Sequence, residues 1–229
     1  MLIFFDIDAT LITTGGVGIK AMVDAGRELF GAEFSSDGIQ FAGRLDPLIL
    51  IDMLERNGQK ASPENLLAMR QAYGRHLPGH LAKGTGRSLP GVTALVSTLG
   101  DANGVTLGLL TGNFAETGLL KLTACGIETD RFTIRVWGDE SPHTPPARNH
   151  LPGVGLSRYR ERFGRAIEPG RVTVIGDTPH DIACAKAHGC RSLGVATGSF
   201  TVDALRACGA DRVVQNLSDT PGIRDWLLS

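Results

Sequence analysis

LIFFDIDATL, residues 2–11, opens the chain with four apolar residues that are followed at once by two closely spaced acids, Asp6 and Asp8. A continuous apolar run without alternation is typical of a β-strand that is covered on both faces. Because alternate residues of an extended strand point the same way, the two acids are predicted to share a side. They would lie at the carboxyl end of the strand, where ligands collect in open α/β sheets.

Further short apolar segments repeat this pattern along the chain, and helical patterns lie between most of them. The later strands are expected at 105–110, 132–136, 172–175, 192–195 and, more weakly, 212–214. Strands and helices in alternation predict an α/β protein with a doubly wound parallel sheet.

One part of the chain interrupts this alternation. Before residue 105 and after the first strand, the sequence shows only helical patterns, over 19–30, 46–56 and 63–81. A parallel sheet normally crosses over through one helix, so these helices exceed what the core needs. We therefore expect an all-helical cap domain, residues 15–87, inserted into an α/β core domain made of residues 1–14 and 88–229. The Gly- and Pro-containing stretch 138–155 is expected to be a surface loop.

Length and charge narrow the class of protein. The 229 residues suffice for one large domain, or for a domain with a smaller insert. With a net charge of −1, no strong field points to nucleic acid or to a membrane surface, which leaves a small molecule as the expected partner. No apolar run approaches the roughly 20 residues that span a bilayer. Nothing in the sequence indicates an oligomeric state.

The cysteines and the N-terminus suggest a compartment. The four cysteines form no C-x-x-C pair and lie in apolar segments, as expected for core thiols in a reducing compartment. The apolar run 2–5 is too short for a secretion signal. We therefore predict a cytoplasmic protein.

Polar residues also follow two of the later strands. Thr111, Gly112 and Asn113 come after the strand expected at 105–110, and Asp177 comes after the strand expected at 172–175. Thr111, with the amides of the next two residues, could donate hydrogen bonds to phosphate oxygens at the start of a helix.

The acids together predict a metal site. Asp6 and Asp8 would repel each other unless a cation or a shared proton intervened. With Asp177 converging from another strand, the ligands are all oxygen atoms, which favours Mg²⁺, whereas zinc would favour His or Cys. Asp181, one helical turn further on, could bind the metal through water or orient Asp177.

Such a site suits phosphoryl transfer. Asp6 could attack phosphorus and form an aspartyl-phosphate, while Asp8 could protonate the leaving oxygen and then activate water. Each residue also has a purely structural interpretation, as a strand-end or helix cap or as a first-turn charge. Their occurrence at three strand ends favours chemistry over that alternative.

The order of these motifs resembles the haloacid dehalogenase superfamily of phosphohydrolases, and within it the phosphoglycolate-phosphatase-like group with a helical cap. Asp-Ile-Asp-Ala-Thr-Leu at 6–11 resembles the family's D-x-D-G-T-L opening, 110–113 resembles its second motif, and 176–181 resembles its G-D-x-x-x-D motif. The resemblance covers nearly the whole chain. It implies that Asp6 is the nucleophile, that Asp8 is the general acid/base, and that Asp6, the Asp8 carbonyl and Asp177 hold Mg²⁺.

Two positions depart from the family pattern. Ala9 replaces a glycine, which is tolerable at negative φ and costly at positive φ. The third motif of the family supplies a basic residue, usually lysine, but no lysine occurs between Lys121 and Lys186. Arg148 is the expected substitute, and its planar fork would reach the nucleophile and the phosphate differently. The alternative is that Arg148 is a solvated loop charge.

The helical insert is expected to close over the site and to choose the substrate. Arg44, in a Gly-Arg-Leu-Asp segment that resembles a family cap loop, could bind a carboxylate or a second anionic group of the substrate. Alternatively, Arg44 and Asp46 only cap the helix that follows.

Several other functions are compatible with parts of the sequence. The segment 16–21 resembles a dinucleotide fingerprint, but it does not directly follow its strand. A phospho-accepting signalling receiver would lack the helical insert. A sugar phosphomutase and a catalytically impaired phosphate-binding relative stay open. We therefore predict a Mg²⁺-dependent phosphatase that acts on a small phosphorylated metabolite.

Overall fold

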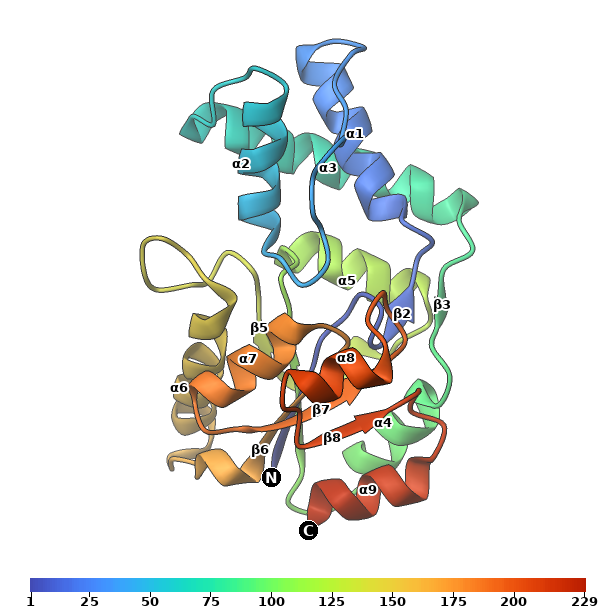
Figure 1. The fold of residues 1–229 in the computed structure, drawn as a ribbon, viewed down its shortest axis with the longest axis vertical. Coiled ribbons are helices and arrows are strands. Elements are labelled where there is room, and N and C mark those ends of the chain that lie inside the picture. Colours follow the sequence, from blue (N-terminus) through green and yellow to red (C-terminus); the bar gives the residue numbers. More distant parts are fainter.

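The computed structural model describes residues 1–229 and is built around one six-stranded sheet in which every pair is parallel (Figure 1). The strands are β1 (Leu2–Phe5), β4 (Thr106–Leu110), β5 (Phe132–Val136), β6 (Val172–Gly176), β7 (Arg191–Val195) and β8 (Arg212–Val214). All six agree with the predicted strands to within one residue at each end. The predicted α/β class with a doubly wound parallel sheet is confirmed.

The first strand lies at the topological switch point of the sheet. The strand order is β5-β4-β1-β6-β7-β8, so the chain adds two strands on one side of β1 and then three on the other. A crevice forms at the carboxyl ends of strands where the winding reverses in this way. Asp6, the residue after β1, therefore lies where this fold class binds ligands.

Both faces of the sheet are covered by helices. The core helices are α4 (Val92–Gly100), α5 (Ala115–Ala124), α6 (Leu151–Phe163), α7 (Pro179–Ala187), α8 (Val202–Ala207) and α9 (Thr220–Leu228). Ile3 and Phe5 of β1 belong to the cluster with α4 and α9, whereas Leu2 and Phe4 belong to the cluster with α6 and α7. This is why the opening run is apolar at every position. No helix combines the length and the apolar character needed to cross a bilayer.

Three further helices form a separate layer at one end of the molecule (Figure 1), which we call the helical cap. They are α1 (Val17–Phe30), α2 (Asp46–Arg56) and α3 (Pro63–Lys83). They share a cluster of 14 buried residues, to which the core contributes Phe114. The inserted all-helical unit is thus present, while its exact limits at 15–87 stay a prediction.

Two local expectations are wrong. The segment before residue 105 does contain strands, because β2 (Ile12–Thr13) pairs antiparallel with β3 (Arg87–Ser88) where the chain enters and leaves the helical cap. Strands of two residues are too short to show a periodicity. Residues 138–155 are not one surface loop, since α6 begins at Leu151, with a proline in its first turn where that residue is tolerated.

Candidate active site

A polar cavity of about 280 Å³ lies between the carboxyl ends of the strands and the helical cap. Only 7 of its 26 lining residues are hydrophobic, which fits a small, polar ligand. Of the residues predicted for the site, those that line the cavity are Asp6, Asp8, Arg44, Thr111, Gly112, Asn113, Arg148 and Asp177. Asp181 lies just behind the lining, next to Arg148.

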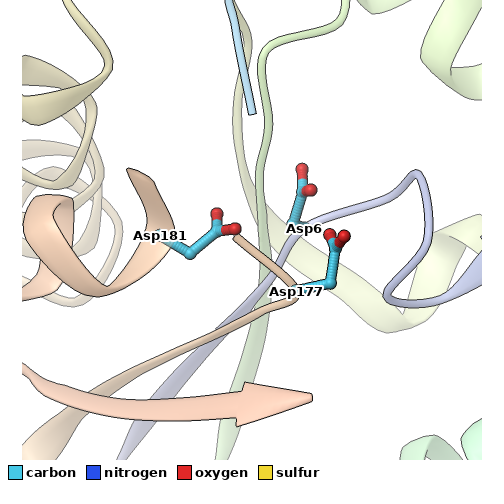
Figure 2. A group of neighbouring side chains, drawn as sticks. All are labelled: Asp6, Asp177 and Asp181. Atoms are coloured by element: carbon cyan, nitrogen blue, oxygen red, sulfur yellow. The ribbon is translucent and has the colours of Figure 1, made fainter. Parts of the chain in front are cut away.

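Three buried acids converge on the floor of this cavity. Carboxylate oxygens of Asp6, Asp177 and Asp181 lie within 4.8 Å of one another. Figure 2 shows Asp6 and Asp177 side by side at the ends of their strands, with Asp181 reaching toward them from the start of α7. Burial and the charges of Asp181 and Asp6 raise the pKa of Asp177 to about 8. Without a cation, this group of acids favours holding protons.

Arg148 neutralises part of this negative charge. Its Nη2 donates to Asp181 Oδ1 at 2.5 Å and lies 3.0 Å from Asp6 Oδ1, and all three side chains are at most 7% exposed. The pKa of Asp6 nevertheless rises to about 6, because burial outweighs the attraction of Arg148. The guanidinium is therefore a buried partner of the nucleophile candidate and not a solvated loop charge.

The oxygen donors fit a divalent cation such as Mg²⁺. One oxygen of Asp177, Oδ1, accepts from the Thr10 hydroxyl at 3.3 Å, which leaves Oδ2 available. A Cβ at Gly198 would lie 1.9 Å from that Oδ2, so glycine keeps the space beside it open. Both oxygens of Asp181 are already bonded, Oδ1 to Arg148 and Oδ2 to the amide and hydroxyl of Thr178. Asp181 is thus better placed to orient its neighbours than to bind a metal directly.

Asp8 points away from these acids, into a second polar network. Its Oδ2 accepts from Lys121 Nζ at 2.8 Å and from Asn113 Nδ2 at 2.9 Å. Lys121 also donates to Asn113 Oδ1 at 2.6 Å. Enclosure in the cavity opposes ionisation of Asp8, but the charge of Lys121 outweighs it, so the pKa of Asp8 lies below its ordinary value. The Asp8 carboxylate therefore belongs to a different network from the three acids.

The second motif belongs to the network of Asp8. Thr111 is fully buried, and its Oγ1 accepts from Asn113 Nδ2 at 2.9 Å. The amide of Gly112 donates to no group of the protein, which leaves it available for a phosphate oxygen. A Cβ at Gly112 would lie 2.0 Å from the carbonyl oxygen of Arg44, so only glycine allows the cap loop to approach this closely.

The cap loop reaches the site through its backbone. The guanidinium of Arg44 pairs with Asp52 of α2, with Nη1 at 2.5 Å from Oδ2. Its neighbour Asp46 contacts the core: its amide donates to the Gly112 carbonyl at 2.7 Å, and its Oδ2 accepts from the Phe114 amide at 3.0 Å. Asp46 therefore caps α5 of the core from the helical cap, rather than only its own helix.

Known proteins are similar to this chain in sequence and fold. A family model described as HAD-hydrolase-like matches residues 149–220. The probable phosphatase IndB of Dickeya dadantii is 24% identical over 99% of this chain and 94% of its own length. The phosphoglycolate phosphatase of Yersinia pestis is 24% identical over 94% of this chain and 89% of its own. Among solved structures, CbbY of Rhodobacter sphaeroides in complex with phosphate has a TM-score of 0.76 at 18% identity, over 95% of each chain.

The chain is a haloacid-dehalogenase-like (HAD-like) hydrolase. In this HAD-like hydrolase, the residues predicted from the sequence share one cavity, with Asp181 directly behind it. The roles assigned to them stay predictions.

Among the cavity residues that sequence reasoning missed are two polar ones next to Asp8 and its partners, Lys121 on α5 and Tyr73 on α3. A signal for Lys121 was available. Lys121 lies ten residues after Thr111, on the same helix face as Thr117 and Gly118. A lysine on the buried face of a helix needs a partner for its charge. Tyr73 offered no comparable signal, because a tyrosine on an apolar helix face is an ordinary core residue.

Proposed function

We propose that this hydrolase is a Mg²⁺-dependent phosphatase that cleaves a small phosphate monoester through an aspartyl-phosphate on Asp6. The observation that carries the proposal is the position of Asp6 at the switch point of the sheet, between Arg148 and the free oxygen of Asp177. The names of the relatives, a probable phosphatase and a phosphoglycolate phosphatase, support the same reaction class.

In the first half-reaction, a carboxylate oxygen of Asp6 attacks phosphorus and the bond from phosphorus to the ester oxygen breaks. Asp8 gives a proton to that leaving oxygen. The approach of an anionic phosphate raises the pKa of Asp8, because a like charge disfavours its ionised form. Asp6, Asp177 and the Asp8 carbonyl would hold Mg²⁺, which when bound offsets the charge of the phosphate.

In the second half-reaction, Asp8 takes a proton from water and the water oxygen attacks the phosphorus of the aspartyl-phosphate. The bond between phosphorus and Asp6 breaks, inorganic phosphate leaves, and the Asp6 carboxylate is restored. Asn113 and Lys121 hold Asp8 through both steps, while the hydroxyl of Thr111 holds Asn113 in place. The four cysteines form no disulfide, which fits the predicted cytoplasmic location.

A phosphate-release screen tests the proposal. Purified protein with Mg²⁺ is assayed on 2-phosphoglycolate, sugar phosphates and nucleoside monophosphates. We expect turnover of at least one ester, its loss in EDTA, and its loss in Asp6→Asn. The matched control is Asp203→Asn, which alters an acid with a 91% exposed side chain and should behave as the wild type.

Three outcomes would contradict this function. Activity that persists in EDTA would remove the metal, and activity that persists in Asp6→Asn would remove the nucleophile. Transfer of phosphate to a second sugar hydroxyl instead of water would identify a phosphomutase.

A further inference from the structure

The side of the cavity that faces the helical cap contains two hydrogen-bond donors without a partner. Tyr73 is fully buried, and its hydroxyl has no hydrogen-bond partner. The hydroxyl of Thr117 lies nearby and donates to the Phe114 carbonyl at 3.3 Å, but no hydrogen bond joins it to the Tyr73 hydroxyl. A buried hydroxyl without a partner costs about 1–3 kcal/mol of stability. Such a cost is expected where the hydroxyl binds a ligand.

The second donor belongs to Lys121. An ammonium group has three donors, and two of those of Lys121 go to Asp8 and Asn113. Burial lowers the pKa of Lys121, but Asp8, Tyr73 and Asp46 raise it by more, so the group stays protonated. One N–H of a permanent cation is therefore left in a cavity wall that it shares with Tyr73.

Gly18 of α1 locates the point where the two donors meet. A Cβ at this position would lie 3.3 Å from Tyr73 Oη and 3.3 Å from Lys121 Nζ. Gly18 lies inside a helix, where alanine would be the better helix former by about 1 kcal/mol. The absence of a side chain here leaves space next to both donors. We call Gly18, Tyr73 and Lys121 the donor corner.

The donor corner lies close to the place where the ester bond would break. Asp8 would touch the ester oxygen, and Lys121 Nζ is 2.8 Å from Asp8. Two hydrogen bonds joined through the Asp8 carboxylate place Lys121 Nζ within about 8 Å of that oxygen. Only a group near the ester can reach it.

We propose that Tyr73 and Lys121 bind an oxygen acceptor of the leaving group, a carboxylate or a hydroxyl near the ester oxygen, and thereby select the substrate. This inference rests on the proposed phosphatase function. It names the substrate class as phosphate monoesters of small, oxygen-bearing alcohols, and it gives Arg44 no part in their recognition.

Three esters of nearly equal size test the proposal with Mg²⁺-loaded protein. Ethyl phosphate carries no second acceptor, 2-hydroxyethyl phosphate carries a hydroxyl, and 2-phosphoglycolate carries a carboxylate. The measured quantity is the ratio of kcat/KM for each acceptor ester to that for ethyl phosphate. In Tyr73→Phe we expect this ratio to fall about tenfold for the acceptor that the corner binds, with most of the change in KM. Which ester changes tells a carboxylate from a hydroxyl.

A pair of glycine variants provides the matched comparison. Gly18→Ala puts a methyl group into the corner and should lower the same ratio. Gly74→Ala adds the same methyl in α3, beside Tyr73 in sequence, where a Cβ meets no atom within 4 Å, and should keep the wild-type ratio. Both changes raise the helix propensity, and thermal denaturation of the two variants tells a loss of folding from an effect on the corner.

Equal ratios in the wild type and in Tyr73→Phe would overturn the inference. If none of the esters is hydrolysed, the proposed phosphatase function fails, but the donor corner is not yet refuted. Measuring how tightly the esters bind then tests the donor corner separately. Calorimetry on Asp6→Asn should show tighter binding of an acceptor ester than of ethyl phosphate, and adding Tyr73→Phe should remove the difference. Equal binding of all three esters would refute the corner.

Discussion

Replacing Arg148 by methionine should destabilise the protein strongly. Arg148, Asp6 and Asp181 are at most 7% exposed, so the small energies of surface ion pairs do not apply. Removing one partner of a buried pair typically costs about 3–5 kcal/mol, because the other charge stays buried and unpaired. In a chain of this size that corresponds to a fall in Tm of roughly 6–20 °C.

The effect of Arg148→Met should depend on pH in a defined direction. The pKa of Asp6 is already raised to about 6 in the folded protein, and loss of the cation raises it further. A carboxyl whose pKa is raised by folding binds more protons when folded, so its stability contribution falls as pH rises. The loss should therefore be larger at about pH 8 than at about pH 5, where protonation relieves the unpaired charge.

Chemical denaturation in EDTA measures this loss without interference from a bound metal. Arg158→Met is the matched control, because it makes the same change on α6 at an ion pair with Glu140 that is 36% and 28% exposed. The control should lose less than about 1 kcal/mol. The reasoning is refuted if Arg148→Met costs no more than Arg158→Met, or if its cost does not change with pH.

Two further changes have predictable effects on stability. Ala9 has φ +57, a left-handed conformation that costs a residue with a side chain about 1–2 kcal/mol. Ala9→Gly should remove this strain, but glycine has more entropy in the unfolded chain, so the free energy of unfolding should rise by about 0.5–1 kcal/mol. A fall in Tm on thermal denaturation would contradict this. Burial raises the pKa of Asp46 to about 7, so wild-type stability should fall as pH rises from about 4 to 7. Asparagine at position 46 would keep the acceptor for the Phe114 amide without the buried charge. The Tm of Asp46→Asn should therefore exceed that of the wild type near pH 8 and lose this advantage near pH 4. A difference in Tm that does not change with pH would exclude a link between the ionisation of Asp46 and stability.

The sheet could be predicted because its signals are local. Most strands contain a short apolar run in the sequence, and Asp6 and Asp177 follow directly after two of the strands. Asp6 and Asp177 therefore needed only the rule that parallel strands end at one edge. Arg148 could be proposed only by elimination, since its contact with Asp6 joins residues far apart in the chain.

The rest of the site depends on contacts that no local pattern contains. Lys121 and Asp8 are separated by 113 positions, and only the packing of α5 against the first motif brings them together. The position of Arg44 was predicted, but the direction of its side chain was decided by Asp52 of α2, the helix that follows the Arg44 loop. The role of Asp46 in capping α5 likewise arises from tertiary contact.

The hydrogen bonds of Asp46 couple two events that are usually treated separately. If the helical cap lifts to admit substrate or to release phosphate, the Phe114 amide loses its acceptor and the Gly112 carbonyl loses its donor. The first turn of α5 then has to be hydrated, and this is the helix that carries Lys121. Opening of the active site and fraying of that helix are therefore one event, and the rate of product release should report on both.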